Sequence, residues 1–136
     1  MKRVALAFLL AAAVAGCGTQ AQSSSVDMFK NPDQKAVAQK IEDLENAGKR
    51  GKADDICSDI LAKSLVDQLD SAGTNCSSEM KKAIDDANEF NLTVENVTVN
   101  GSTATAEVKQ GDTGPTETMR FAKENGQWRA TALSNG

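Results

Sequence analysis

The chain has 136 residues, of which 40% are hydrophobic and 25% are charged. This length and composition fit one small folded domain and exclude a disordered or membrane-embedded chain. The chain has 19 acidic and 15 basic residues and so carries a net negative charge. We therefore do not expect it to bind a nucleic acid. The chain has no histidine and no tyrosine, which excludes His-activated nucleophiles, His-containing zinc sites and phenolic general acids. Carboxylates are the groups that remain for acid–base chemistry.

Residues 1–16 have the pattern of a bacterial signal peptide. Two basic residues precede the 13 apolar or small residues 4–16, a run of roughly 20 Å as a helix, whereas a bilayer core needs ~30 Å. The run ends in Val14-Ala15-Gly16-Cys17, which resembles the lipobox of bacterial lipoproteins. That resemblance implies that Cys17 is acylated and holds the protein on the extracytoplasmic face of a cell membrane. The alternative is an ordinary secretory signal with an incidental cysteine.

Cleavage before Cys17 would divide the chain into a signal peptide (1–16), a lipidated tether (17–30) and a folded domain (31–136). The loss of Lys2 and Arg3 would change the net charge from −4 to −6. Residues 18–30 are polar and without periodicity, and we expect a flexible tether of roughly 20 Å. Because Gly18 follows the cysteine, the outer membrane is also allowed if the host has two membranes.

Three amphipathic helices are predicted after the tether. Asn31 is expected to cap the first helix, with Gln34 in a capping box and Gly48 at the end. A second helix is predicted from about Ala53 to Leu69, and a third after Cys76. Either Ser77 or Ser78 is expected to open the third helix. We interpret the segment 48–52 (GKRGK) as a helix cap and basic turn, because it lacks the spacing of a phosphate-binding loop.

From Phe90 onward the hydrophobic period changes to two, which indicates strands. Asn100-Gly101 predicts a tight hairpin, and one extra residue near Glu95-Asn96 is needed to keep the apolar side chains on one face. The expected partners are Val99 with Ser102, Val97 with Ala104, Val94 with Ala106 and Leu92 with Val108.

Asn125-Gly126 predicts a second hairpin. The expected partners are Lys123 with Trp128, Phe121 with Ala130 and Met119 with Ala132. This register places Met119, Phe121 and Trp128 on one face. Residues 110–115 join the hairpins into a four-stranded antiparallel meander.

Cys57 and Cys76 form an even pair once Cys17 is acylated, and we expect a disulfide in an exported protein. It would stabilise the fold by roughly 3 kcal/mol. The alternative is two buried free thiols. No CxxC motif is present, so neither a redox site nor a zinc site is supported, and no metal or cofactor is expected.

The order of these motifs resembles the nuclear transport factor 2-like superfamily, a cystatin-like type of fold. The resemblance rests on Asp55-Ile56-Cys57, Asn75-Cys76, the strand 99–106 and Glu124-Asn125-Gly126-Gln127-Trp128-Arg129. More narrowly, the chain is similar to small actinobacterial lipoproteins of that type. The resemblance implies an α+β fold in which three N-terminal helices pack on a strongly curved four-stranded antiparallel meander. The helices and the curved sheet of this superfamily form a cone. By the resemblance, the residues lining its core or a pocket would be Leu92, Val94, Met119, Phe121 and Trp128.

These observations favour a cell-surface lipoprotein whose domain binds a small apolar ligand without catalysis. One alternative is an interaction or scaffold domain that binds another envelope protein. A carboxylate-based enzyme is a third hypothesis, although Asp54-Asp55 and Asp85-Asp86 are interpreted as solvated helix faces.

Overall fold

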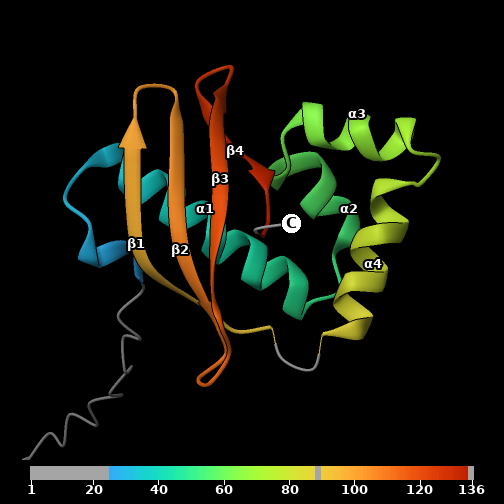
Figure 1. Cartoon of the computed structure of the whole chain (residues 1–136), viewed down its shortest axis with the longest axis horizontal. Coiled ribbons are helices and arrows are strands. Elements are labelled where there is room, and N and C mark those ends of the chain that lie inside the picture. The colour runs from blue at the N-terminus through green and yellow to red at the C-terminus, as the bar shows by residue number, and fades with distance from the viewer. Residues whose placement is uncertain (1–24, 88–89, 135–136) are drawn as a thin grey trace, which may run out of the picture.

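A computed structural model of the chain describes residues 25–87 and 90–134. The expected signal peptide and Cys17 lie outside these residues. The fold is α+β, with an antiparallel sheet in the order β1-β2-β3-β4 and helices packed against it (Figure 1). The helical segments are η1 (Ser25–Met28), α1 (Pro32–Lys49), α2 (Ala53–Asp55), η2 (Ile56–Ile60), α3 (Lys63–Ser71) and α4 (Cys76–Asp86). The strands are β1 (Leu92–Asn100), β2 (Thr103–Gln110), β3 (Thr116–Glu124) and β4 (Gln127–Ala132).

Helix α1 lies across one face of the sheet and begins as predicted. The Asn31 side chain accepts hydrogen bonds from the amides of Asp33 (2.8 Å) and Gln34 (3.4 Å). The expected capping box is wrong in one respect, because the Gln34 side-chain amide donates to the Val97 carbonyl at 2.8 Å. Its side chain therefore ties the helix to β1.

The end of α1 explains the basic turn. Gly51, with φ of 67°, occupies the left-handed position that the prediction gave to Gly48. The Lys52 amide donates to the Ala47 carbonyl (2.9 Å) and the Gly51 amide to the Gly48 carbonyl (3.0 Å). These two bonds define a Schellman motif, so the glycine pair in this segment serves a helix end.

The single helix predicted over 53–69 is wrong. Helix α2 passes into the π-helical turn η2, the backbone becomes extended at Leu61 and Ala62, and α3 starts at Lys63. Leu61 forms a parallel bridge with Ala130 of β4, and the Ala62 amide donates to the Ala130 carbonyl at 2.8 Å. Both residues of this short segment are buried, at 2% and 0% exposure. Burial and pairing with β4 override the local helical pattern here.

Helix α4 is present as predicted, but it starts at Cys76, earlier than expected, and its cap is neither Ser77 nor Ser78. The side chain of Asn75 accepts a hydrogen bond from the Ser78 amide at 3.3 Å. Asparagine is as good a cap as serine, and Asn75 has the extended backbone that a cap residue needs.

The bulge predicted in β1 is confirmed, whereas the register of the first hairpin differs. Glu95 is the extra residue, between the pairs Val94–Val108 and Asn96–Glu107. The turn is formed by Gly101-Ser102, with Gly101 at φ of 62°, so each expected partner moves by two positions. The observed pairs are Asn100 with Thr103, Val99 with Ala104, Val97 with Ala106 and Leu92 with Gln110. A shift of two preserves the faces.

The second hairpin has the predicted turn, with Asn125 and Gly126 at φ of 51° and 79°. The pairs Lys123–Trp128 and Phe121–Ala130 are confirmed. The pair of Met119 with Ala132 is wrong, because β4 contains a second bulge and Ala132 lies opposite Arg120.

The core lies between α1, η2, α4 and one face of the sheet. Residues 25–29, expected within the tether, belong to the domain, because Val26 and Phe29 pack against this core. Figure 1 shows η1 beside β1, at the edge of the sheet.

Both edge strands make contacts outside the ladder. Besides the Gln34–Val97 bond on β1, the Glu45 carboxylate accepts from the Leu92 amide at 3.0 Å. On β4, Arg129 donates to the Ser58 carbonyl at 2.6 Å, next to the Ala62–Ala130 bond. The edges therefore have some of their backbone groups occupied by α1 and by the segment 58–62.

Candidate functional site

An apolar cavity of about 190 Å³ lies between the sheet, the end of α1, η2 and α4. Its lining is apolar except for two side chains, Gln110 and Glu117. The apolar lining consists of Leu44, Ile56, Met80, Ala83, Ile84, Ala87, Phe90, Leu92, Val108, Met119 and Leu133. In Figure 1 the end of α4, the start of β1 and the loop between β2 and β3 lie at the same end of the molecule.

The periodicity of each element builds this cavity. Met80, Ile84 and Ala87 recur at spacings of four and three on α4, which places them on one face of the helix. Successive side chains of a strand point to opposite faces, so Glu117 shares the inner face of β3 with Met119. The pair Leu92–Gln110 closes the same end of the sheet.

The five residues predicted to line a core or pocket divide into two groups. Leu92 and Met119 line the cavity. Val94, Phe121 and Trp128 lie in the packed core, with exposures of 1%, 2% and 3%. The cavity therefore occupies one end of the inner sheet face, and the other end is filled by side chains.

A polar cluster of Asp33, Lys123 and Trp128 lies at the filled end. The Trp128 indole N–H donates to the Asp33 carboxylate at 3.0 Å, and the Lys123 ammonium lies 2.7 Å from the same oxygen. The ammonium is also 5.2 Å from the centre of the Trp128 ring, within cation–π range. The hydrogen bonds from Lys123 and Trp128 hold the pKa of Asp33 below its usual value. This cluster fixes the start of α1 to the β3–β4 hairpin.

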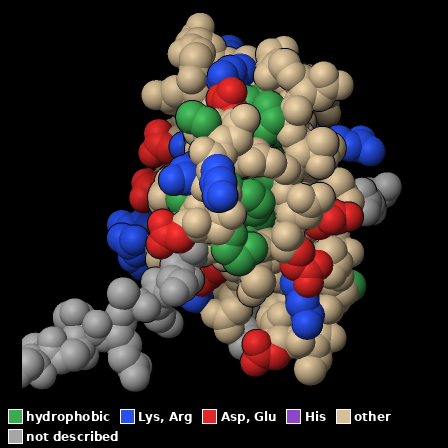
Figure 2. Space-filling model, turned by 90° about the vertical axis from the view of Figure 1, so that its left-hand side faces the viewer, with side chains coloured by type: hydrophobic (Ala, Val, Ile, Leu, Met, Phe, Trp, Pro, Cys, Tyr) green, Lys and Arg blue, Asp and Glu red, His purple; other side chains and the backbone are tan. Residues whose placement is uncertain are grey.

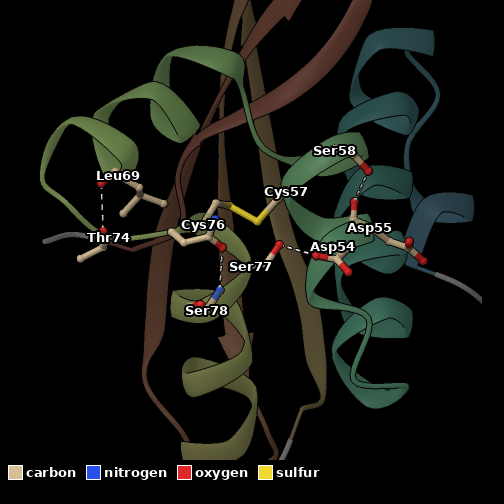
Figure 3. Close-up of a disulfide and its surroundings, with 10 residues drawn as sticks. Asp54, Asp55, Cys57, Ser58, Leu69, Thr74, Cys76, Ser77 and Ser78 are labelled. Atoms are coloured by element: carbon tan, nitrogen blue, oxygen red, sulfur yellow. Dashed lines mark hydrogen bonds between the residues drawn. A yellow bond between two sulfur atoms is a disulfide. The ribbon is translucent and has the colours of Figure 1, made fainter.

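The predicted disulfide between Cys57 and Cys76 is present, with the two Cα atoms 6.1 Å apart. Figure 3 shows it joining η2 to the first turn of α4, with Ser77 hydrogen-bonded to Asp54 beside it. Because α4 supplies one wall of the cavity, this crosslink positions that wall against η2.

Sequence reasoning missed Phe90 and the whole α4 wall as parts of the site. Phe90 packs on buried Gly48 of α1, where a β-carbon would lie 2.2 Å from its Cε1 atom. The alternation of β3 carries a signal for Glu117, which stands two residues before Met119. No pattern in the sequence brings α4 to the same end of the sheet.

Charged side chains are on the surface of the described residues, where none is buried. Asp54, Asp55, Asp85 and Asp86 are all exposed. No group of three or more His, Cys, Asp or Glu residues suited to a metal ion occurs in the ranges 25–87 and 90–134. None of the helices in the described part of the chain has the length and apolarity needed to cross a bilayer.

The face seen in Figure 2, on the β1 side of the molecule, carries hydrophobic side chains only in small areas separated by charged and polar ones. Within the described residues the large hydrophobic side chain with high exposure is Met28, at 63%. An isolated exposed apolar side chain is ordinary for a soluble domain. Among the described residues, the cavity beside α4 has a lining made almost wholly of hydrophobic side chains, and it is the hollow to which we attach a function.

No protein-family model matches the chain, and neither a curated protein nor a solved structure matches it at a significant level.

Proposed function

We propose that the protein is a lipid-anchored, extracytoplasmic binding protein that takes a small apolar ligand into the cavity between α4 and the sheet. The lipobox-like Val14–Cys17 segment supports the anchor. The cavity carries the binding role, because it is apolar and is formed by the sheet together with α1, η2 and α4. A curved nuclear transport factor 2-like cone is the finer description of the fold that we propose, and the helices on one face of a four-stranded meander support it.

The size of the cavity sets the class of ligand. A dry apolar cavity of about 150 Å³ is large enough to bind benzene, and the cavity here is about 190 Å³. It therefore suits an aromatic ring or a short alkyl chain. Removing roughly 150 Å² of ligand surface from water contributes about 4 kcal/mol at ~25 cal/mol per Å², which corresponds to a Kd of about 1 mM.

Binding without catalysis is supported by the chemistry of the lining. The chain has no histidine or tyrosine, and Glu117 is the carboxylate among the cavity residues. One carboxylate without a second titrating group provides a contact for a ligand, whereas acid–base catalysis at one centre commonly uses two groups with different pKa values.

The methionines provide a direct test in the anchored full-length protein. Met80 and Met119 line the cavity, whereas Met28 is exposed outside it. With ¹³C-methyl methionine and the protein in lipid nanodiscs, benzene is expected to shift the NMR signals of Met80 and Met119 and to leave Met28 unchanged.

The matched variants are Ala83→Phe and Ala36→Phe. Both alanines are exposed on helices, but only Ala83 lines the cavity. Ala83→Phe is expected to weaken the benzene response severalfold, and Ala36→Phe to preserve it. If the signals of Met80 and Met119 do not respond, or if they shift equally in both variants, the cavity does not bind the probe and the proposed function is wrong.

A further inference from the structure

The inner face of β3 carries a charge near each end, and within the described residues only one of the two forms an ion pair. Toward the β3–β4 hairpin, Lys123 forms an ion pair with Asp33 of α1. At the other end of the strand, Glu117 continues the inward series of Phe121 and Met119 into the lining of the cavity. The same sheet face is therefore closed by an ion pair at one end and ends in an unneutralised carboxylate at the other.

Glu117 is partly buried and lies directly opposite Val108 in the β2–β3 ladder. Its carboxylate makes no hydrogen bond or ion pair with any residue in the ranges 25–87 and 90–134. The Gln110 side chain, which also lines the cavity, makes none within the same ranges. The partly buried Glu117 carboxylate therefore has no partner among the described residues beside an apolar surface, and the Gln110 amide next to it is exposed.

The Glu117 end of the cavity would favour some polar groups of a ligand over others. A carboxylate next to apolar groups is stabilised by an added hydrogen-bond donor, and a cation adds Coulomb attraction. An anionic head would instead meet the like charge of the Glu117 carboxylate. The net charge of −4 over the chain acts in the same direction, because it attracts cations and repels anions.

We propose that the ligand is a cationic amphiphile, with its apolar part in the cavity and a protonated amine against the Glu117 carboxylate. The side-chain oxygen of Gln110 provides a second acceptor at the same end. This inference rests on the proposed function, since the apolar part of the ligand occupies the cavity described above. Fatty acids and other carboxylate amphiphiles are the class that the site rejects.

The test compares three probes that share a six-carbon chain: hexylamine, 1-hexanol and hexanoate. Each is titrated at pH 7 into the full-length protein in nanodiscs, and the methyl signals of Met80 and Met119 report binding. Hexylamine is expected to bind roughly three- to tenfold more tightly than hexanol, and hexanoate more weakly than either. Added salt should reduce the hexylamine affinity and leave the hexanol affinity nearly unchanged.

Glu117→Gln should remove the preference for the amine while preserving the hexanol affinity. The matched control is Glu107→Gln, which makes the same charge change on an exposed residue of the outer sheet face. That variant should keep the preference. If Glu117→Gln does not fold, Glu117→Asp and the salt dependence of the native protein test the same contact.

Two negative results are distinguishable. If all three probes shift Met80 and Met119 with equal affinity, or if Glu117→Gln keeps the order of affinities, the head-group inference is overturned and the apolar cavity stands. If none of the three probes shifts either methyl signal, both the proposed function and this inference are wrong.

Discussion

Replacing Gly48 with alanine tests the close packing of Phe90 against α1. A β-carbon at this position would lie 2.2, 2.4 and 2.5 Å from three atoms of the Phe90 ring. Ordinary contact between carbon atoms needs about 3.5–4.0 Å, so the ring must move by more than 1 Å. Overpacking of this kind costs about 1–3 kcal/mol, and the better helix propensity of alanine returns about 0.5–1 kcal/mol. We therefore expect a net loss of about 1 kcal/mol in the free energy of unfolding.

The same substitution should have the opposite sign when Phe90 is absent. In a Phe90→Ala background the ring atoms are gone, and Gly48→Ala should stabilise α1 by about 0.5–1 kcal/mol. The double-mutant cycle, measured by urea denaturation of the four variants, should give a coupling energy of about 1–3 kcal/mol. A coupling energy near zero, or a stabilising effect of Gly48→Ala in the wild-type background, would refute the packing argument.

Three further changes have defined outcomes. Reducing the Cys57–Cys76 bond should lower the free energy of unfolding by roughly 3 kcal/mol; an unchanged urea midpoint with reductant would contradict this. Lys123 and Trp128 lower the folded-state pKa of Asp33 from its usual 3.8, so the carboxylate stabilises the fold above that value and loses its contribution as the pH falls through the lowered pKa. Asp33→Asn should therefore be less stable than wild type at neutral pH, with the difference disappearing in acid; a constant difference in urea midpoint from about pH 7 to about pH 2 would count against the ion pair. Gly126→Ala, at φ of 79°, should destabilise the β3–β4 hairpin by about 1–2 kcal/mol in thermal unfolding, and an unaltered Tm would show that this turn tolerates a side chain.

Local chemistry predicted the β3–β4 turn, the faces of the strands and the first helix cap. Asn31 and the Asn125-Gly126 turn succeed because the deciding interactions lie within a few residues. The bulge at Glu95 was predictable for a different reason: without an extra residue, the apolar side chains of β1 would point to opposite faces.

The register of the β1–β2 hairpin could not be predicted in this way. Asn100-Gly101 and Gly101-Ser102 both place glycine in a two-residue turn, and a shift of two keeps every side chain on its face. The hydrophobic pattern is the same for both registers, so it could not choose between them.

The interruption of the helix after Ile60 could not be predicted from the sequence. Neither glycine nor proline marks the position, and Leu61 fits a helical spacing as well as it fits a strand. The extended backbone at this position is fixed by the Ala130 carbonyl, which is far away in the chain and accepts a hydrogen bond from the Ala62 amide. The same non-local packing brings α4 to the open end of the sheet, so the cavity could be anticipated only through the family resemblance.

The contacts on the outer strands limit how copies of the protein can meet. An open sheet can grow by adding a strand from a second chain, which is a common start of aggregation and domain swapping. Here an incoming strand would have to displace the Ala62 amide on β4, or the Gln34 and Glu45 side chains on β1. These contacts therefore hinder edge-to-edge polymerisation of copies of the domain at high local concentration.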